Sequence, residues 1–480
     1  MNFLEIAMNE ATFLGADYAD IRIQNTHKES IYLRNLSLKN TSDNVIYGYG
    51  IRIMKNGAWG FAHNNIFSKE AVVATVKKAF NTALLSSQIK NGKGLKLAYE
   101  RSYKAKYKTP IAIDPFSVPL KEKVDLMLEV NKTMLNYNDI KQAMFYIVSQ
   151  TDHKLFASTL GTNLDLTTTF VTPVITATAV TNDDSQSRSF NLGGHAKGWE
   201  FVLENNFLEK APVIAEEAIM KVKAENLGDE KRRDLLLDPI HLSLTMHESV
   251  GHPTELDRVL GWEADFAGIS FATPEKLKNY RYGSKLVNFS GDNTLTDGLA
   301  TAGFDDDGVS GQKWSIIKDG ILNEYGTTRD TAPFIGENMS RGCNRATNYY
   351  DFPINRIPNL YLEPGKKPLS PQDLISDTED GILIEGQGSF SIDQHRVNFQ
   401  FGGDLFWEVK NGKKTRMLKK VIYRSNNPEF WNSVDAICDE RYWKSFGVIN
   451  CGKGQPMQAG RMTHGASLTR FKNIRVGGSK

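Results

Sequence analysis

Residues 246–253 read MHESVGHP and place two histidines and a glutamate within six positions. Imidazole nitrogens are good zinc ligands, and a neighbouring carboxylate can take a proton from a metal-bound water molecule. The spacing is HExxxH, so the histidines stand at positions i and i+5. On a regular α-helix, residues five apart point about 140° away from each other, and one zinc ion could not bind both. The stretch therefore predicts a local departure from α-helical geometry.

Two departures fit this sequence. A single π-turn closes an i→i+5 hydrogen bond and brings residues five apart onto one face. Alternatively the helix ends here, because Pro253 disfavours the α region for His252 and Gly251 can adopt conformations that other residues resist. A third interpretation is that His247 and His252 are ordinary histidines near a helix end, since short motifs also match by chance. A further soft ligand elsewhere in the chain would favour the metal site.

The helix that carries the motif has a clear start. Residues 235–237 are three leucines, which is typical of a short buried strand. Asp238 is a suitable N-cap, and Pro239 falls at the first helical position, where its missing N–H costs nothing. We therefore expect a strand, a cap and then a helix that leads into the motif.

The composition of the chain bounds its class. Its 480 residues are enough for two or three domains, and 58 Lys and Arg against 56 Asp and Glu leave a net charge of +2. That charge offers no argument for binding to nucleic acid or to a membrane surface. No apolar run approaches the ~20 residues that span a bilayer, and residues 1–15 form an amphipathic helix pattern rather than a signal peptide. Three cysteines indicate a reducing compartment, so we expect a cytoplasmic protein.

The first half of the chain mixes helix and strand patterns. Asn56-Gly57 lies between two alternating runs in 47–62 and predicts a hairpin. A Lys-, Gly- and Pro-rich stretch, about 88–118, predicts a surface connection. The other predicted elements are a helix in 1–15, strands at 19–23 and 31–36, a helix capped by Ser68, a helix at 120–135, strands at 142–150, 154–158 and 164–180, and a helix at 211–224. We interpret 1–230 as an N-terminal α/β domain.

The second half is predicted to be mainly antiparallel sheet, closed or curled into a barrel. Asp-Gly and Asn-Gly pairs recur there as turn signals, at 297–298, 307–308, 319–320, 380–381 and 411–412. Short apolar runs lie between them, at 313–317, 382–385, 397–401 and 405–409. The predicted fold class is therefore α+β, with 231–480 forming a β-rich, barrel-like C-terminal domain that carries the metal-site helix.

Cys451 is a candidate third ligand for the metal. It lies in the glycine-rich stretch 450–456, NCGKGQP, which we expect to be a turn that could bring a thiolate close to a distant helix. Cys438 sits on an apolar face and is expected to be a small core residue. Cys343 is assigned to neither class.

Several motifs together resemble one known family. They are GADYAD at 15–20, the hairpin, HESVGH at 247–252, FDDDG at 304–308, and the stretch 451–471 with CGKGQP and THGA. In this order, and nearly from end to end, the chain resembles the TldD/PmbA metallopeptidases. Residues 340–349 and 355–359 match that family only loosely, which concerns substrate preference and not the metal.

The resemblance implies a peptidase with one Zn²⁺ per catalytic subunit, held by His247, His252 and Cys451, with Glu248 as the general base. It also implies an α/β domain followed by a β-rich domain. The expected partner is a second subunit, in a homodimer or in a heterodimer with a PmbA/TldE-like subunit that lacks the metal motif. The expected substrates are unfolded peptides admitted to an enclosed site, with no nucleic acid and no membrane involved.

Three side chains keep open roles. His464 could be a fourth ligand, a catalytic hydrogen-bond donor in the transition state, or a structural histidine. Arg345 and Tyr349 lie in a predicted loop, where such side chains are usually solvated or packed.

Two other classes of function compete with the peptidase. A non-catalytic peptide-binding or scaffolding subunit would lack the His, Glu, His and Cys set, which this chain has complete. A metal-thiolate redox protein would need a second cysteine near Cys451, and the sequence has none there.

Overall fold

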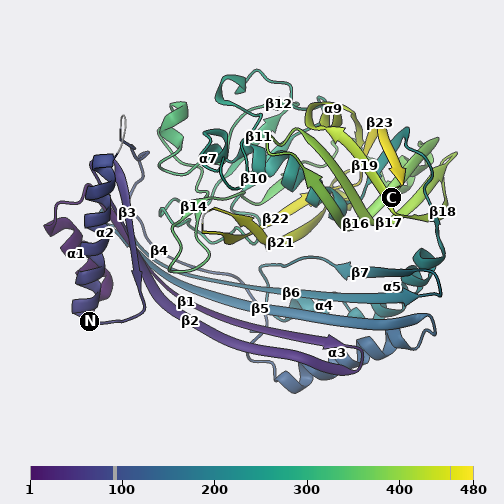
Figure 1. The fold of residues 1–480 in the computed structure, drawn as a ribbon, viewed down its shortest axis with the longest axis horizontal. Coiled ribbons are helices and arrows are strands. Elements are labelled where there is room, and N and C mark those ends of the chain that lie inside the picture. The colour runs from purple at the N-terminus through teal and green to yellow at the C-terminus, as the bar shows by residue number, and fades with distance from the viewer. Residues whose placement is uncertain (1, 90–93, 455, 479–480) are drawn as a thin grey trace.

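The computed structural model describes residues 2–89, 94–454 and 456–478. It has two parts, a long curved sheet with helices at both ends and a β-rich part that lies across the concave face of that sheet (Figure 1). About 24% of the chain is helix and 43% is strand, and the predicted α+β class is confirmed. Of the residues expected to form the turn at 450–456 and the connection at 88–118, 455 and 90–93 lie outside the described residues.

The N-terminal sheet has the order β3-β2-β1-β5-β6-β4, with β7 also paired to β6. Its neighbours are antiparallel except for β4 and β6, which run parallel. The strands are β1 (Tyr18–Arg34), β2 (Ser37–Lys55), β3 (Ala58–Asn64), β4 (Lys104–Lys108), β5 (Ile140–Ser158), β6 (Asn163–Val180) and β7 (Ser185–Asn191). The helices are α1 (Phe3–Phe13), α2 (Lys69–Ile89), α3 (Leu120–Leu135), α4 (Glu200–Glu204) and α5 (Phe207–Lys223). Helices α1 and α2 pack at one end of the sheet, and α3 and α5 at the other (Figure 1).

The predicted division of the long strands was wrong. Strand β1 is continuous over 17 residues, where two separate strands were expected, and β5 likewise joins two predicted strands. The middle of β1 is polar, and two of its side chains are buried: Gln24 donates to the Thr347 carbonyl and Thr26 donates to Asp152. Hydrogen bonds across the face of the sheet thus replace the apolar alternation that marks a strand in sequence.

The predicted hairpin is confirmed at Asn56 and Gly57. Both residues have positive φ, 50° and 67°, and they join Lys55 to its cross-strand partner Ala58. Two consecutive positive φ angles match the type I′ turn, whose twist suits a tight antiparallel hairpin.

The C-terminal part contains the predicted barrel. Strands β16, β9, β23, β19 and β17 pair in that order, and β17 pairs back with β16 to close it. The bounds of these strands and of those paired to the barrel are β8 (Glu225–Asn226), β9 (Lys231–Leu237), β16 (Asp380–Ile392), β17 (Asn398–Lys410), β18 (Lys413–Lys419), β19 (Val421–Asn426), β20 (Val434–Ile437) and β23 (Thr469–Gly478).

Two details of the predicted barrel strands were wrong. The runs at 397–401 and 405–409, apart from residue 397, belong to the single strand β17. Asp380-Gly381 begins strand β16 instead of forming a turn, because Gly381 pairs in parallel with Asp234 of β9. The backbone partner, which the sequence does not reveal, decides the conformation of this dipeptide.

A second sheet lies beside the barrel, with the order β12-β11-β10-β15-β22-β21. Its strands are β10 (Phe289–Asp292), β11 (Lys313–Lys318), β12 (Ile321–Leu322), β15 (Leu360–Leu362), β21 (Lys444–Lys453) and β22 (Gln458–Ala466), and a separate pair is formed by β13 (Asn344–Arg345) and β14 (Ile354–Asn355). The C-terminal helices are α6 (Pro239–Met246), α7 (Leu256–Val259), α8 (Pro371–Ser376) and α9 (Asn427–Asn432). Helix α6 contacts β16 of the barrel and β21 and β22 of the second sheet, so the motif lies between the two.

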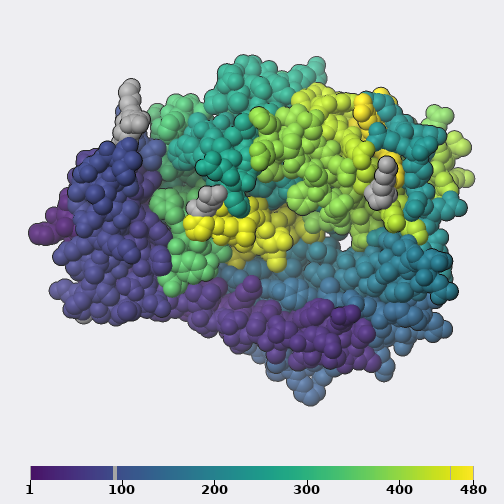
Figure 2. Space-filling view, viewed as in Figure 1, coloured from purple at the N-terminus to yellow at the C-terminus, as the bar shows by residue number. Residues whose placement is uncertain are grey.

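Buried ion pairs join the two parts of the molecule. Arg22 of β1 lies 2.9 Å from Asp306, and Arg52 of β2 lies 2.6 Å from Asp20 and 2.8 Å from Asp307. All five side chains are nearly inaccessible to solvent. The space-filling view shows the C-terminal strands seated directly on the N-terminal sheet (Figure 2). Within the described part of the chain, none of the helices is long and apolar enough to cross a membrane.

Candidate metal centre

The helix that leads into the motif begins as the sequence predicts. Strand β9 ends at Leu237, and the Asp238 side chain accepts a hydrogen bond from the His241 backbone N–H at 2.7 Å. Pro239 occupies the first turn. Leu242, Met246 and Val250 are fully buried in the C-terminal core, so apolar packing fixes the position of the helix and its rotation about its axis.

A π-turn brings the two motif histidines together. Residues His247–Gly251 form a π-helix, in which the His252 N–H donates to the His247 carbonyl five residues earlier. The two imidazole centroids lie 4.7 Å apart. A short 3-10 turn, His252–Thr254, follows. The first of the two predicted departures from the α-helix is therefore the one that occurs.

The alternative explanation by helix termination was wrong. Gly251 has φ −58° and ψ −63°, and His252 has φ −61° and ψ −40°, so both keep helical backbone angles. Glycine at position 251 instead leaves room for a neighbouring side chain. A Cβ atom there would lie 2.9 Å from Cδ1 of Ile357, which is fully buried.

Side chains satisfy carbonyl groups of the π-turn. The Ser249 carbonyl accepts from the Tyr282 hydroxyl and, at 2.5 Å, from the Asn427 side-chain amide. The Thr254 hydroxyl donates to the Val250 carbonyl at 2.7 Å. Unpaired buried carbonyls are costly, so these donors stabilise the π-turn at this position.

The structure places Cys451 beside the histidines, but not in a turn. Cys451 lies in strand β21, opposite Gly460 of β22, where a register shift interrupts the pairing after Val448. The predicted turn at 450–456 was wrong at this residue, because pairing with β22 extends β21 to Lys453. The positive φ of Gly454, 86°, marks where the chain turns.

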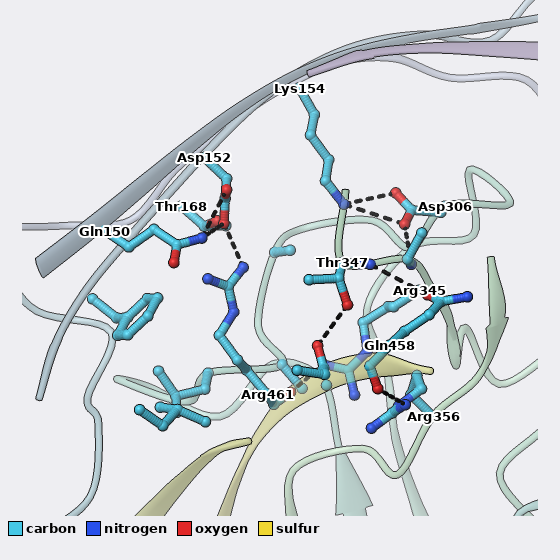
Figure 3. Close-up of a pocket in the computed structure, with 18 of the residues that line it drawn as sticks. Gln150, Asp152, Lys154, Thr168, Asp306, Arg345, Thr347, Arg356, Gln458 and Arg461 are labelled. Carbon is cyan, nitrogen blue, oxygen red and sulfur yellow. Dashed lines mark hydrogen bonds and ion pairs between the residues drawn. The ribbon is translucent and has the colours of Figure 1, made fainter. Parts of the chain in front are cut away.

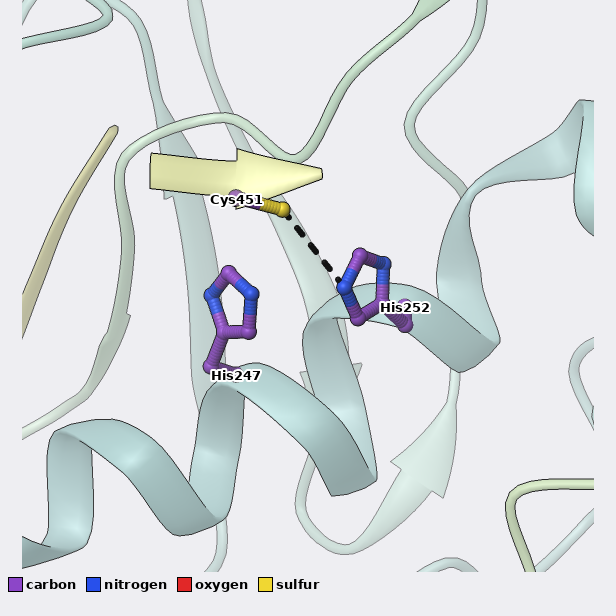
Figure 4. A group of neighbouring side chains, drawn as sticks. All are labelled: His247, His252 and Cys451. Atoms are coloured by element: carbon purple, nitrogen blue, oxygen red, sulfur yellow. Dashed lines mark hydrogen bonds between the residues drawn. The ribbon is translucent and has the colours of Figure 1, made fainter. Parts of the chain in front are cut away.

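The distances suit a single metal ion. One ligand atom from each of His247, His252 and Cys451 lies within 4.8 Å of the others (Figure 4). The Cys451 Sγ to His252 Nε2 distance is 3.6 Å. Tetrahedral zinc with ordinary bond lengths of ~2.1 Å to nitrogen and ~2.3 Å to sulfur would hold such a pair about 3.6 Å apart. The donor set has three members, which would leave a fourth coordination position for water or substrate.

His464 fixes the tautomer of His247. Nε2 of His464 lies 2.7 Å from Nδ1 of His247, and Nδ1 of His464 lies 3.2 Å from the Leu360 carbonyl oxygen. Burial, with a smaller contribution from His247, holds the pKa of His464 well below its usual value, so the ring is neutral. Because a carbonyl only accepts, the His464 proton is on Nδ1, its Nε2 accepts from His247 Nδ1–H, and the lone pair of His247 is on Nε2.

Glu255 fixes the tautomer of His252. Its Oε2 atom lies 2.7 Å from His252 Nδ1, which leaves Nε2 of His252 to face Cys451. Lys453 lies 3.1 Å from the other carboxylate oxygen, and Arg258 lies 3.4 Å from Oε2. Burial raises the pKa of Glu255, but Lys453 and His252 outweigh it and hold the pKa well below its usual value. The carboxylate is thus ionised and available to orient the imidazole.

The pKa values of the three donors are each shifted in the direction that favours metal binding. Burial lowers the pKa of both His247 and His252, which keeps the imidazoles neutral near pH 7. Burial by itself raises the pKa of the Cys451 thiol, but His252 and Arg356 reverse this and bring it below its usual value. Neutral imidazole and thiolate are the forms that bind zinc.

Glu248 is buried and forms an ion pair that the sequence did not suggest. Nη1 of Arg396 lies 2.5 Å from Oε2 of Glu248, and Nη2 donates to the Ala267 carbonyl at 3.1 Å. Arg396 sits between β16 and β17 with a φ of 62°. Nothing in the sequence around Arg396 marks it as a partner, whereas Glu255, three residues after His252, could have been found from its helical spacing.

The other singled-out residues lie elsewhere. Arg345 lies in β13, is half-buried and lines a cavity. Tyr349 packs over Gly48, where a Cβ atom would lie 2.5 Å from its ring, and against His63. Cys438 is a core residue as predicted. Cys343 is buried in the C-terminal core, where burial raises its thiol pKa to about 12.

Comparison with protein families and known proteins gives consistent matches. Models described as PmbA/TldA metallopeptidase domain 1, central domain and C-terminal domain match residues 19–83, 113–225 and 230–478. A metalloprotease from Methanocaldococcus jannaschii is 28% identical over 453 residues, which cover 92% of this chain and 94% of that protein. A protein named zinc metalloprotease TldD homolog, from Saccharolobus solfataricus, is 23% identical over 98% of this chain and 99% of its own length.

The fold also matches solved structures. The crystal structure of TldE from Thermococcus kodakarensis superposes with a TM-score of 0.71 over 99% of this chain and 100% of that one. The sequence identity of the pair is 14%, so this likeness concerns the fold alone.

Proposed function

This chain belongs to the PmbA/TldD family of metallopeptidases, and from this premise we propose that it is a zinc-dependent peptidase that hydrolyses bonds in unfolded or small peptides. The observation that carries the proposal is the 3.6 Å separation of Cys451 Sγ and His252 Nε2, at a point where two imidazoles and a cysteine sulfur converge. Such a soft, three-member donor set suits a catalytic zinc better than a structural one, which would be closed by four ligands.

His247, His252 and Cys451 would hold one zinc ion per catalytic subunit. When bound, zinc lowers the pKa of a coordinated water molecule toward ~7 and polarises a carbonyl group. Glu255 and His464 act one step further out, because each holds a ligand imidazole in the tautomer that presents Nε2. In this assignment His464 positions His247 and does not itself exchange protons with substrate.

Glu248 is the proposed general base. It follows His247 in the motif and is close enough to affect the pKa of that imidazole, and its carboxylate would take a proton from the attacking water and pass it to the leaving amine. Arg396 engages Oε2, and no hydrogen bond among the described residues uses Oε1, which is therefore the oxygen that would carry the proton. The Arg396 contact to the Ala267 carbonyl holds this arrangement in place.

The proposed working form is a dimer, with a second copy of this chain or with a PmbA/TldE-like subunit. A zinc peptidase must be kept from folded proteins, and a roof supplied by a second subunit would admit only extended chains. The runner-up function is a non-catalytic peptide-binding or scaffolding subunit of such a complex.

One experiment separates these functions. The protein is purified alone and with a PmbA/TldE-like partner, its metal content is measured, and both samples are incubated with an unfolded peptide and a stable globular protein. The peptidase proposal expects close to one zinc per chain and cleavage of the peptide only. A metal-free sample that binds the peptide without cleaving it, alone and with the partner, would favour the non-catalytic subunit. Rapid digestion of the globular protein by a monomer would contradict the enclosed site.

A further inference from the structure

A cavity with a volume of about 210 Å³ lies between the N-terminal sheet and the C-terminal part (Figure 3). Strands β5 and β6 line one side of it, and the segment 345–347 and strand β22 line the other. It adjoins the metal centre, because Gly460 on its wall is the cross-strand partner of Cys451.

The carboxylates that line the cavity already have partners, either cationic side chains or backbone N–H groups. Asp152 is paired with Arg461, and Asp306 lies 3.0 Å from Lys154. Asp306 is also paired with Arg22. Asp305 accepts hydrogen bonds from backbone N–H groups of residues 307, 309 and 344. None of them is a counter-ion for a further cation.

Two further arginines line the cavity, Arg345 and Arg356, and neither has a carboxylate partner among the described residues. Among the described residues, no Asp or Glu oxygen lies within 4.0 Å of either guanidinium group. Within the described ranges, Arg345 donates only to the carbonyls of Arg461 and Ile357, and Arg356 only to those of Gln458 and Cys451. The buried Nε atom of each has no hydrogen-bond partner in the part of the chain that the structure describes. Burial, with the charges of Arg356 and Arg461, lowers the pKa of Arg345 to about 10, which still leaves it charged at neutral pH.

The chain makes room for one of these cations. A Cβ atom at Gly460 would lie 2.3–2.5 Å from three atoms of the Arg356 guanidinium group. Arg356 therefore lies flat against bare backbone, on the strand that pairs with the ligand strand. Its exposed fraction is 1%, so the charge is held in the interior and not in solvent.

A zinc ion would not supply the missing negative charge. Two positive charges on the ion against one thiolate leave the centre positive, and the guanidinium charges add to it. Buried charges are stable only when they are paired, so an anion is expected in this cavity when the site is at work. Planar guanidinium groups bind carboxylates through parallel hydrogen bonds.

We infer that Arg345, with the buried positive charge of Arg356 behind it, forms a carboxylate-binding subsite for the peptide substrate, next to the metal centre. The carboxylate is the C-terminus of the peptide or an Asp or Glu side chain. This inference rests on the proposed peptidase function and deepens it, since it assigns a class of preferred substrate: peptides that bring a negative charge within a few residues of the cleaved bond.

The test uses equilibrium binding, so that it does not depend on turnover. Four peptides of one sequence, labelled with a fluorophore, carry a free C-terminus or an amide, and a Glu or a Gln at one internal position. Their affinities for the zinc-loaded Glu248→Gln protein are measured by fluorescence anisotropy. A charge-assisted hydrogen bond contributes roughly 1.5–3 kcal/mol, so a carboxylate in the subsite is expected to tighten binding about 10–100-fold. Comparing the free-acid with the amide peptides, and the Glu with the Gln peptides, shows whether the C-terminal or the side-chain carboxylate binds to the subsite.

The variant Arg345→Gln is expected to abolish the preference, and Arg345→Lys to keep part of it. Lys28→Gln is the matched control, since Lys28 lines the same cavity but is exposed, and its removal should change the preference less than twofold. Equal affinity of all four peptides for the parent protein would overturn the inference, as would a full preference in folded Arg345→Gln and Arg356→Gln proteins. If charged peptides bind better but are never cleaved by the parent enzyme, the peptidase proposal fails and the subsite stands. If cleavage occurs without any preference for charged peptides, the subsite is ruled out and the peptidase proposal stands.

Discussion

Nε2 of His464 lies 2.7 Å from Nδ1 of His247, although 217 positions separate the two residues in the chain. The contact joins the motif helix to strand β22, the strand that also pairs with the strand of Cys451. One sheet therefore carries both a candidate ligand and the partner that orients another. This makes the geometry of the centre depend on the pairing of β21 with β22 as much as on the motif itself.

Exchanging the base and a ligand separately tests their roles. Glu248→Gln is expected to leave zinc content and fold nearly unchanged and to lower turnover by about 10²–10⁴-fold, which is typical of a lost general base. Cys451→Ser is expected to release zinc as well, because two histidines alone bind it poorly. Zinc analysis of the purified proteins and a peptide-cleavage assay give both readouts.

Two outcomes would change this assignment. Loss of zinc from both proteins would make Glu248 a ligand, and an active Cys451→Ser protein would remove the cysteine from the mechanism. Cys438→Ser provides the control, since it makes the same exchange at a buried thiol away from the centre.

Removing the partner of His247 is expected to weaken the metal site without abolishing it. His464→Ala should lower zinc affinity by about 10–100-fold, as is usual when an outer partner of a ligand is lost. His464→Gln should retain more affinity, because its amide oxygen can still accept the proton of His247 Nδ1. Competition with a chromophoric chelator measures both. Equal affinity of the parent and His464→Ala proteins would show that the imidazole does not need this contact.

The buried ion pairs between the two parts predict a pH-dependent stability. Burial raises the pKa of Asp306, but Lys154 and Arg22 outweigh it and hold the pKa well below its usual value. A carboxyl group with a lower pKa in the folded state stabilises the fold above its unfolded pKa of about 3.9, and this contribution is lost as the pH falls further. Asp306→Asn should therefore cost about 3–5 kcal/mol at neutral pH, and progressively less below about pH 4.

Urea unfolding of both proteins at neutral pH and near pH 3 measures this change. Asp125→Asn is the control, because Asp125 and its partner Lys121 are exposed, and an exposed pair contributes about 0–1 kcal/mol. A difference between parent and Asp306→Asn that grows on acidification has the wrong sign and would contradict the assignment.

The contact between Gly251 and Ile357 predicts that mutations at these two positions have non-additive effects on the free energy of unfolding. Alanine in a helix is favoured over glycine by up to ~1 kcal/mol, but its Cβ atom would press on Cδ1 of Ile357, which typically costs about 1–3 kcal/mol. Gly251→Ala should therefore be destabilising. Ile357→Val removes the obstructing methyl group, so the double variant should be more stable than the sum of the single effects implies. Additive unfolding free energies would mean that the π-turn tolerates the extra atom without this contact.

The sequence predicts the motif region well because its signals are local. The cap at Asp238 and the need for a departure from α-helical geometry, of which a π-turn was one of two predicted forms, follow from residue types and spacing within fifteen positions. The partners that complete the centre are different in kind. Arg396, Leu360 and the donors from Tyr282 and Asn427 reach the motif only through the folding of distant strands, and no short-range pattern marks them.

The same distinction explains the strands. The Asn56-Gly57 hairpin depends on two adjacent residues and was predicted, whereas the continuity of β1 depends on contacts to Asp152 and Thr347, which lie far away in the chain. The strand environment of Cys451 was missed for the same reason, since its partner Gly460 gives it β-structure in a stretch whose composition indicates a turn. The division of the chain at residue 230 stays a prediction.

The π-turn at 247–251 has a consequence for how such motifs arise. A π-turn holds one residue more than the α-turn it replaces, and the surplus is absorbed inside the helix, so the segments before and after it keep their places. Deleting one codon within 249–251 would convert the spacing of the histidines to i and i+4, which a regular helix presents on one face. The HExxH and HExxxH motifs thus differ by the insertion of one residue. Because the π-turn absorbs that residue, one motif could evolve into the other while the surrounding fold stays the same.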